Sequence, residues 1–186
     1  MKRRDLVQWL GATALIGPLA APRAWGRDVA VPVPDVRLLD QGARTHALRA
    51  LCEGPTVIGF FYTGCATVCP PQTAALRALR ERLDQGAGAK RARVLSITVD
   101  PLGDPPEVLR AYAQRFEVRL GLDAGWLMLT GQPQVLKQVW TAFGVPVGDP
   151  SEHSSLLWLG SGARGRWTRA AATTPTERLL ELLQKV

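Results

Sequence analysis

Two cysteines, Cys65 and Cys69, stand where an apolar segment gives way to a pattern typical of a helix. The unpaired backbone N–H groups and the dipole at a helix N-terminus stabilise negative charge, so thiolates are favoured at this position. A thiolate is the nucleophile of disulfide exchange and also a soft metal ligand. The pair is therefore a candidate redox centre and a candidate metal site.

The spacing of the two cysteines leaves both kinds of chemistry open. Residues four apart on a helix share a face, with Cα atoms about 6 Å from each other. That separation suits a disulfide, and it equally suits two sulfurs on one ion. A purely structural disulfide is a third interpretation, although open α/β sheets place their functional sites where a strand hands over to a helix.

Other potential ligands lie far away in the sequence. His153 precedes an apolar strand-like segment, after the tripeptide Pro150-Ser151-Glu152. Taken alone it is either an ordinary histidine or a distant ligand. His46 falls in a predicted strand without a partner and is interpreted as structural. Cys52 is interpreted as a small buried residue, with a redox role beside the pair as the alternative.

The elements around the pair follow from hydrophobic patterning. The apolar segment 56–62 predicts a buried strand, and the leucines after Cys69 predict a helix with one core-facing side. Asp104 and Pro105 predict the cap and first residue of another helix, and Thr174 predicts the cap of the last one. The remaining segments predict strands at 94–99 and 126–129, helices at 105–116, 132–143 and 175–185, and hairpins at 36–40 with 45–48 and at 155–159 with 166–169.

Alternation of strands and helices predicts an α/β sandwich with parallel central strands. Paired thiols at the end of the first central strand make this the layout of a thioredoxin-like fold. We therefore expect a central mixed sheet flanked by helices, with an N-terminal hairpin. One domain is expected over residues 35–186, preceded by a linker at 27–34.

Residues 1–26 have the pattern of an export signal. Lys2, Arg3 and Arg4 precede a mostly apolar segment, and Ala24-Trp25-Gly26 offers a cleavage site. The paired arginines resemble the bacterial twin-arginine signal. The expected location is the periplasm, with contact to the membrane only through an uncleaved signal, because the apolar segment is shorter than the roughly 20 residues needed to span it.

Charge argues against one class of partner. The formal net charge of this 186-residue chain is +7, but its basic residues are dispersed and no nucleic-acid-binding motif accompanies them. We expect no nucleic-acid partner.

Four segments together resemble the Sco/SenC family of copper-handling proteins with a thioredoxin-like fold. They are FFYTGCATVCPPQ, SITVDP followed by DPPEVLRAYAQRF, WLMLTGQPQVLKQVWTAFGV, and EHSSLLWL, in the family's order. The resemblance implies that Cys65, Cys69 and His153 bind copper, as Cu(I) or Cu(II). It also implies a role in assembling a copper centre such as that of cytochrome oxidase, with a copper-receiving subunit and a thiol reductant as partners. Two thiolates and an imidazole suit copper, and Cu(I) is a soft ion.

A thiol–disulfide oxidoreductase is the alternative function. Cys65 and Cys69 would then be the redox-active pair, one attacking and one resolving, and the substrate would be cysteines of an exported copper protein.

This chain departs from the Sco/SenC family pattern at two places. It has Ala66-Thr67-Val68 between the cysteines and Glu152 before the histidine.

Overall fold

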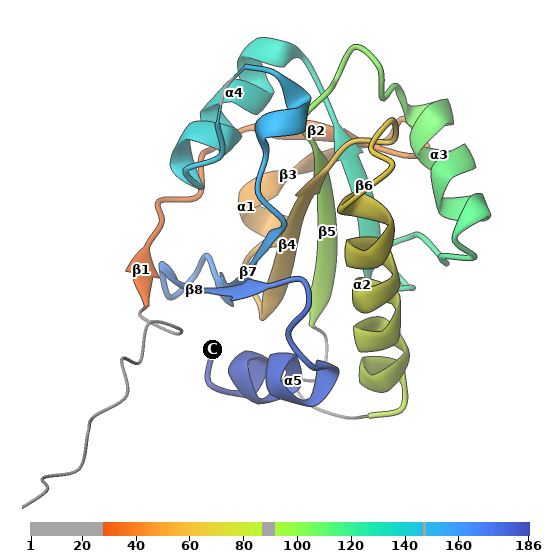
Figure 1. The fold of residues 1–186 in the computed structure, drawn as a ribbon. Helices are drawn as coiled ribbons and strands as arrows, with labels where there is room; N and C mark the ends of the chain where they lie inside the picture. Colours follow the sequence, from red (N-terminus) through yellow and green to blue (C-terminus); the bar gives the residue numbers. More distant parts are fainter. Residues whose placement is uncertain (1–27, 87–91, 147) are drawn as a thin grey trace, which may run out of the picture.

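An eight-stranded mixed sheet forms the centre of the protein in a computed structural model (Figure 1). The structure describes residues 28–86, 92–146 and 148–186. The strand order is β1-β8-β7-β4-β5-β6-β2-β3. The strands are β1 (Val29–Ala30), β2 (Arg37–Asp40), β3 (Thr45–Ala47), β4 (Thr56–Phe61), β5 (Arg93–Thr98), β6 (Trp126–Thr130), β7 (Leu156–Ser161) and β8 (Arg166–Ala171).

The middle of the sheet is parallel and its sides are antiparallel. Strand β4 pairs in parallel with β5, which pairs in parallel with β6. On one side β7 and β8 form the expected hairpin, antiparallel to β4, and on the other β2 and β3 form the expected N-terminal hairpin. This confirms the mixed α/β sheet of a thioredoxin-like fold.

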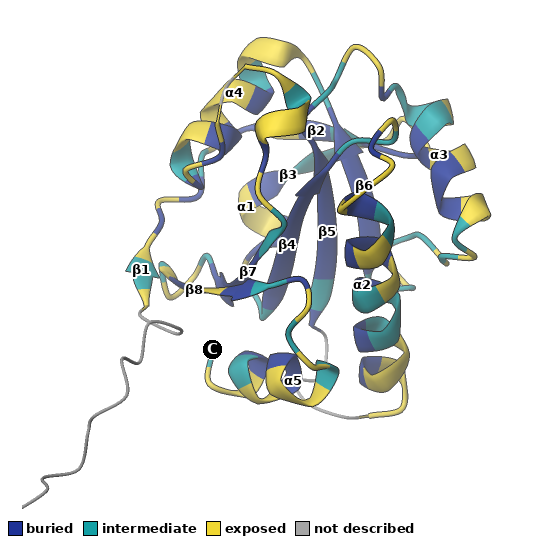
Figure 2. Ribbon diagram, in the orientation of Figure 1, coloured by how far each residue is buried: buried dark blue, intermediate teal, exposed yellow. Residues whose placement is uncertain are grey.

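Helices cover both faces of the sheet. They are α1 (Leu48–Leu51), α2 (Cys69–Asp84), α3 (Pro106–Arg115), α4 (Pro133–Ala142) and α5 (Thr176–Gln184), with a short 3₁₀ helix, η1 (Pro150–Glu152). Apolar side chains of α1 and α4 pack in one core cluster, whereas those of α2, α3 and α5 pack in the other. Figure 2 shows the buried strands between these layers.

Strand β4 is the central element because it contributes to both clusters. All six of its residues are buried. Ile58 and Phe60 face the cluster that contains α4, while Val57 and Phe61 face the cluster that contains α2. The alternation follows from the two-residue period of a strand, and it explains why the sequence here is continuously apolar.

Helices α3, α4 and α5 each begin one residue later than the sequence predicts. Pro105 rather than Asp104 is the N-cap of α3, and Pro175 rather than Thr174 is the N-cap of α5. Asp104 does not cap its helix because its carboxylate accepts hydrogen bonds from Thr63 and Thr98 instead. Strand β1 and the short helices α1 and η1 were not predicted, because each has fewer residues than a hydrophobic period needs.

The segment before the first hairpin, predicted to be an extended linker, packs on the domain where it is described. Val29 and Ala30 pair with β8, and Val31 and Val33 are buried. Burial of these apolar side chains offsets the entropy lost on ordering the segment. The predicted export signal lies outside the described residues. Within the described part of the chain, no helix is both long and apolar enough to cross a membrane.

Candidate metal and redox site

The two cysteines lie at the junction of β4 and α2. After β4 the chain turns, and the backbone N–H of Cys65 donates to the carbonyl of Tyr62 at 3.3 Å. Helix α2 then begins at Cys69, with Pro70 and Pro71 in its first turn. Proline is tolerated there because the first backbone N–H groups of a helix have no partner within it. The predicted handover from strand to helix is confirmed.

Cys65 and Cys69 face each other as free thiols in the structure, and both are buried. The backbone N–H of Cys69, one of the unpaired donors at the start of α2, points at the sulfur of Cys65 at 3.4 Å. A second contact joins that sulfur to the hydroxyl of Thr67 at 3.7 Å. Donors aimed at a sulfur stabilise its ionised form.

His153 lies beside the cysteines although it is 84 positions after Cys69 in the chain. It follows η1, is only 7% exposed, and places Nε2 3.3 Å from the sulfur of Cys69. Its Nδ1 lies 2.6 Å from the carbonyl of Pro150. A carbonyl can only accept, so Nδ1 carries the proton and the lone pair of Nε2 faces Cys69. This is the tautomer that a metal-binding histidine needs.

Tyr62 forms the wall between the strand end and the histidine. Its ring meets the His153 ring edge-on, with centroids 5.5 Å apart and planes at 80°. Burial, the two cysteine sulfurs and Asp149 raise the pKa of Tyr62. The phenol therefore stays neutral and restrains the imidazole by packing.

The two thiols have opposite electrostatic surroundings. Burial works against ionisation of Cys65, but hydrogen bonds from the backbone of Cys69 and Thr67 outweigh it and lower the pKa to about 7. Burial and the nearby Cys65 sulfur raise the pKa of Cys69 to about 12. At pH 8 and above the pair is thus largely one thiolate and one thiol, and the Cys69 S–H can donate to His153.

The buried carboxylate of Asp104, which the sequence predicts only as a helix cap, supports the turn that holds Cys65. Asp104 is 1% exposed and accepts hydrogen bonds from the backbone N–H and hydroxyl of Thr63 and from the hydroxyl of Thr98. It therefore ties the turn before Cys65 to the end of β5. A threonine two residues before the first cysteine is a signal too weak to reveal this contact in advance.

The remaining candidates lie elsewhere. Cys52 is fully buried, and it packs in the core cluster on the opposite face of the sheet from Cys65 and Cys69. His46 contacts the buried carboxylate of Asp40 at 2.8 Å, within the β2–β3 hairpin. The structural interpretations of both residues agree with these positions.

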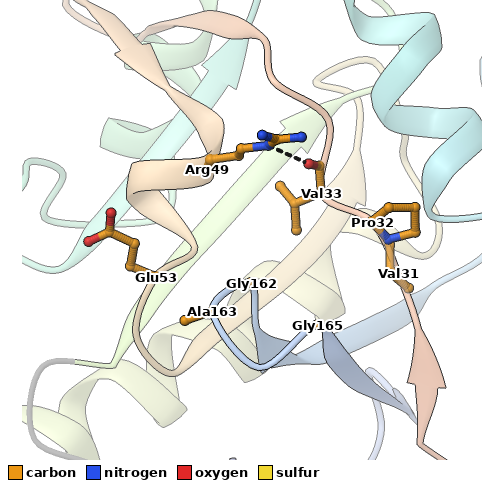
Figure 3. Close-up of a pocket in the computed structure, with 8 residues that line it drawn as sticks. All are labelled: Val31, Pro32, Val33, Arg49, Glu53, Gly162, Ala163 and Gly165. Atoms are coloured by element: carbon orange, nitrogen blue, oxygen red, sulfur yellow. Dashed lines mark hydrogen bonds between the residues drawn. The ribbon is translucent and has the colours of Figure 1, made fainter.

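A cavity of about 620 Å³ is separate from the cysteines (Figure 3). It lies between the segment around Val33, the end of α1 and the tip of the β7–β8 hairpin. Arg49 and Glu53 line it, and Arg49 donates to the carbonyl of Val33 at 3.0 Å. Since Glu53 precedes β4 whereas Cys65 follows it, the cavity is at the other end of the strand.

The donor set of Cys65, Cys69 and His153 fits a soft metal ion. With zinc-like bond lengths, an ion bound to both Cys69 and His153 would hold sulfur and nitrogen about 3.5 Å apart, close to their present spacing. Among the described residues, no three His, Cys, Asp or Glu side chains are arranged so that they could hold a metal ion together as they stand. The arrangement is a hydrogen-bonded chain, in which the backbone N–H of Cys69 contacts the Cys65 sulfur and the Cys69 sulfur contacts Nε2 of His153.

Comparison with known proteins shows the family of this chain. The SCO1/SenC family profile matches residues 33–185, which include both cysteines and the histidine. The chain belongs to the SCO1/SenC family. Its resemblance to that family, inferred from four segments, is confirmed.

Individual SCO1/SenC relatives support the assignment at different levels. A SCO1 protein homolog of Bacillus subtilis is 33% identical over 95 residues, which are 51% of this chain and 47% of that protein. The chain spans about half the length of the curated relatives it matches. ScoI of Bradyrhizobium japonicum, solved with copper bound, is 26% identical, covers 80% of this chain and 95% of its own, and superposes with a TM-score of 0.59.

A further structure supports the fold alone. BsSco, described as a member of the Sco family of cytochrome c oxidase assembly proteins and as having a disulfide switch, is 23% identical to this chain. It covers 86% of this chain and 95% of its own, with a TM-score of 0.71.

Proposed function

We propose that this SCO1/SenC protein is an exported metallochaperone that binds copper and delivers it to a respiratory copper centre. Cys65, Cys69 and His153 would be the ligands. The observation that carries the proposal is the 3.3 Å contact between the Cys69 sulfur and Nε2 of His153. The nitrogen presents its lone pair to the thiols because Nδ1 is occupied by Pro150.

Ligand exchange would release the ion. An incoming thiol or imidazole of the partner replaces one ligand at a time, so no covalent bond to the chaperone is needed. An oxidised Cys65–Cys69 pair offers no thiolates, so the redox state of the pair would control loading. A thiol reductant is accordingly part of the proposed system, and the copper-receiving partner is a subunit such as that of cytochrome oxidase.

The proposed location is the periplasm. Its support is the charged and apolar pattern of residues 1–26 in the sequence. A structurally similar protein of Bacillus anthracis, 22% identical to this chain, is described as a SCO1/SenC family lipoprotein.

Copper bound per protein is the measurement that tests the proposal. The reduced protein should hold one copper ion against a chromophoric Cu(I) chelator, and a Cys65→Ser, Cys69→Ser variant should hold none. His153→Ala should weaken the affinity at least tenfold, whereas His46→Ala, which alters a histidine of the β2–β3 hairpin, should not. Equal affinity in wild type and His153→Ala would remove the histidine from the site.

A thiol–disulfide oxidoreductase is the second candidate function because the pKa values of the two thiols differ strongly. A pKa of about 7 at Cys65 and about 12 at Cys69 is the asymmetry expected of an attacking and a resolving cysteine. Under this function His153→Ala should leave reduction of a disulfide substrate largely intact, and Cys65→Ser should abolish it. Loss of both copper binding and reductase activity in His153→Ala would argue against this candidate.

A further inference from the structure

The loops around the cysteines form a surface whose charge is opposite to that of the protein as a whole. We define the site face as three loops, made of residues 62–68, of residues 99–105, and of residues 143–146 with 148–155. The first two loops lie at the same end of the sheet because β4 and β5 are parallel. The third joins them through the contact of His153 with Cys69. Figure 1 shows all three at one end of the domain.

Acidic residues are the charged residues of this site face. Asp100, Asp149 and Glu152 are at least partly exposed, Asp104 is buried, and the three loops contain no Lys or Arg. The full chain, by contrast, has a net charge of +7. Asp149 lies close enough to Tyr62 to help raise the pKa of its phenol. A negative field therefore acts at the mouth of the thiol pair.

Apolar side chains project from the same loops. Three large apolar residues in the described part of the chain are exposed: Val68 at 40%, Leu102 at 84% and Leu122 at 48%. Val68 immediately precedes Cys69. Leu102 lies in the same loop as Asp104. The carboxylate of Asp104 accepts hydrogen bonds from Thr63, and Thr63 is two residues before Cys65. Exposed apolar groups beside a reactive centre are typical of a surface that a partner covers.

We infer that the site face docks a positively charged, partly apolar segment of a partner protein, with Val68 and Leu102 as the apolar contacts and Asp149 and Glu152 as the charge-recognising residues. Such a segment carries Lys or Arg beside a leucine-like side chain and brings its own thiol or imidazole to Cys65. The site face supplies steering toward that segment, and the positive remainder of the chain repels it from other approaches. The inference deepens the proposed function by defining the chemistry of its partner.

Disulfide exchange with charged probes tests the charge component without copper. The Cys65 thiolate attacks one sulfur of the probe and expels the other as a thiolate; Cys69 then resolves the mixed disulfide. The pair is oxidised and the probe is reduced to two thiols. Cystamine is the cationic probe and dithiodiglycolate the anionic probe, with rates followed by acid quench and mass spectrometry on the reduced full chain.

Comparing variants with the same probes cancels the intrinsic reactivity of each probe. Asp149→Asn with Glu152→Gln should lower the ratio of the cystamine rate to the dithiodiglycolate rate about threefold to tenfold at low salt, and the difference should shrink in 0.5 M salt. Glu53→Gln with Asp123→Asn, which removes two exposed carboxylates outside the site face, should leave the ratio unchanged. An unchanged ratio in the Asp149, Glu152 variant would overturn the charge assignment.

A peptide probe tests the apolar component. The probe is acetyl-Leu-Lys-Cys-Lys-Leu-amide, joined through its cysteine to mercaptoethanol. Leu102→Ser should slow exchange with this peptide severalfold but leave the rate with cystamine unchanged, and Leu122→Ser should affect neither. Equal effects of Leu102→Ser and Leu122→Ser would overturn the apolar docking surface.

These measurements separate the inference from the proposed function. Charge-selective exchange in a protein that binds no copper would preserve the docking face and reject the metallochaperone. Tight copper binding with no charge selectivity would preserve the metallochaperone and reject the docking face.

Discussion

The sulfur of Cys69 and Nε2 of His153 lie 3.3 Å apart, although 84 positions separate them in the chain. Helix α2 holds the first and the turn after η1 holds the second. The histidine cannot rotate its other nitrogen toward the sulfur without losing the hydrogen bond to Pro150. His153 is therefore held with Nε2 toward Cys69, and under the proposed function this fixed orientation lowers the entropy lost on binding copper.

The first prediction concerns the titration of Cys65. In the reduced, metal-free protein, thiolate absorption near 240 nm should rise with a midpoint near pH 7, because backbone donors stabilise the Cys65 thiolate. Cys65→Ser should remove this transition and leave only absorption at strongly alkaline pH, where Cys69 and Cys52 ionise. A transition near pH 7 that persists in Cys65→Ser would assign it to another group.

The second prediction is a dependence of stability on pH. The pKa of Cys65 is about 7 in the folded protein against an ordinary value of 9.0, so between pH 7 and 9 the unfolded chain binds more protons. The stabilisation from Cys65 is complete above pH 9 and is lost as pH falls through 7. The free energy of unfolding of wild type relative to Cys65→Ser should therefore increase by about 1–2 kcal/mol from pH 7 to 9. Urea unfolding under reducing conditions measures it, and a flat difference would contradict the assignment.

The third prediction is proton release on copper binding. Above pH 8 Cys65 is already ionised whereas Cys69 retains its proton, because burial raises its pKa to about 12. Copper binding should then release about one proton per ion, and below pH 6 about two. Calorimetry in buffers of different ionisation enthalpy measures this number. Two protons at every pH would show that Cys65 has an ordinary thiol pKa.

The fourth prediction concerns Asp104. Asp104→Ala should lower the free energy of unfolding by about 2–4 kcal/mol, because donors on Thr63 and Thr98 lose their acceptor in a largely buried position. Asp104→Asn keeps an acceptor oxygen and should cost less. Asp123→Ala, at an exposed carboxylate, is the control and should change stability by less than about 0.5 kcal/mol. A similar small effect for Asp104→Ala would show that the turn does not depend on this carboxylate.

The fifth prediction concerns Gly160 in β7. A Cβ at this position would lie within 3 Å of the Trp167 ring, with the backbone carbonyl of Arg166 equally close. Neither neighbour can withdraw, because Trp167 is fully buried and the carbonyl belongs to β8. Gly160→Ala should therefore destabilise the protein by about 2–3 kcal/mol, whereas Gly54→Ala, where the added Cβ meets nothing, should not. Thermal unfolding of the two variants provides the comparison.

Local patterns in the sequence determined the sheet and the place of the cysteines. The apolar segment before Thr63 and the leucines after Cys69 specify a strand and an amphipathic helix through their own periods, so the junction that holds both thiols follows from neighbouring residues. The starts of α3, α4 and α5 lie one residue later than predicted, and for α3 the cap depends on which donors the carboxylate of Asp104 finds. The carboxylate of Asp104 accepts from Thr63, 41 positions away, and from Thr98 at the end of β5, and a local pattern shows neither contact.

The tertiary structure alone decided which histidine joins the thiols and how the two thiols differ. His46 and His153 are equally plain in the sequence, and the resemblance to a family favoured His153. Only the folded position of His153, edge-on to the ring of Tyr62, places its Nε2 at Cys69, whereas His46 contacts Asp40. The divergence of the Cys65 and Cys69 pKa values likewise arises from burial and from donors aimed at one sulfur. Both depend on distances between atoms, which composition and spacing along the chain do not fix.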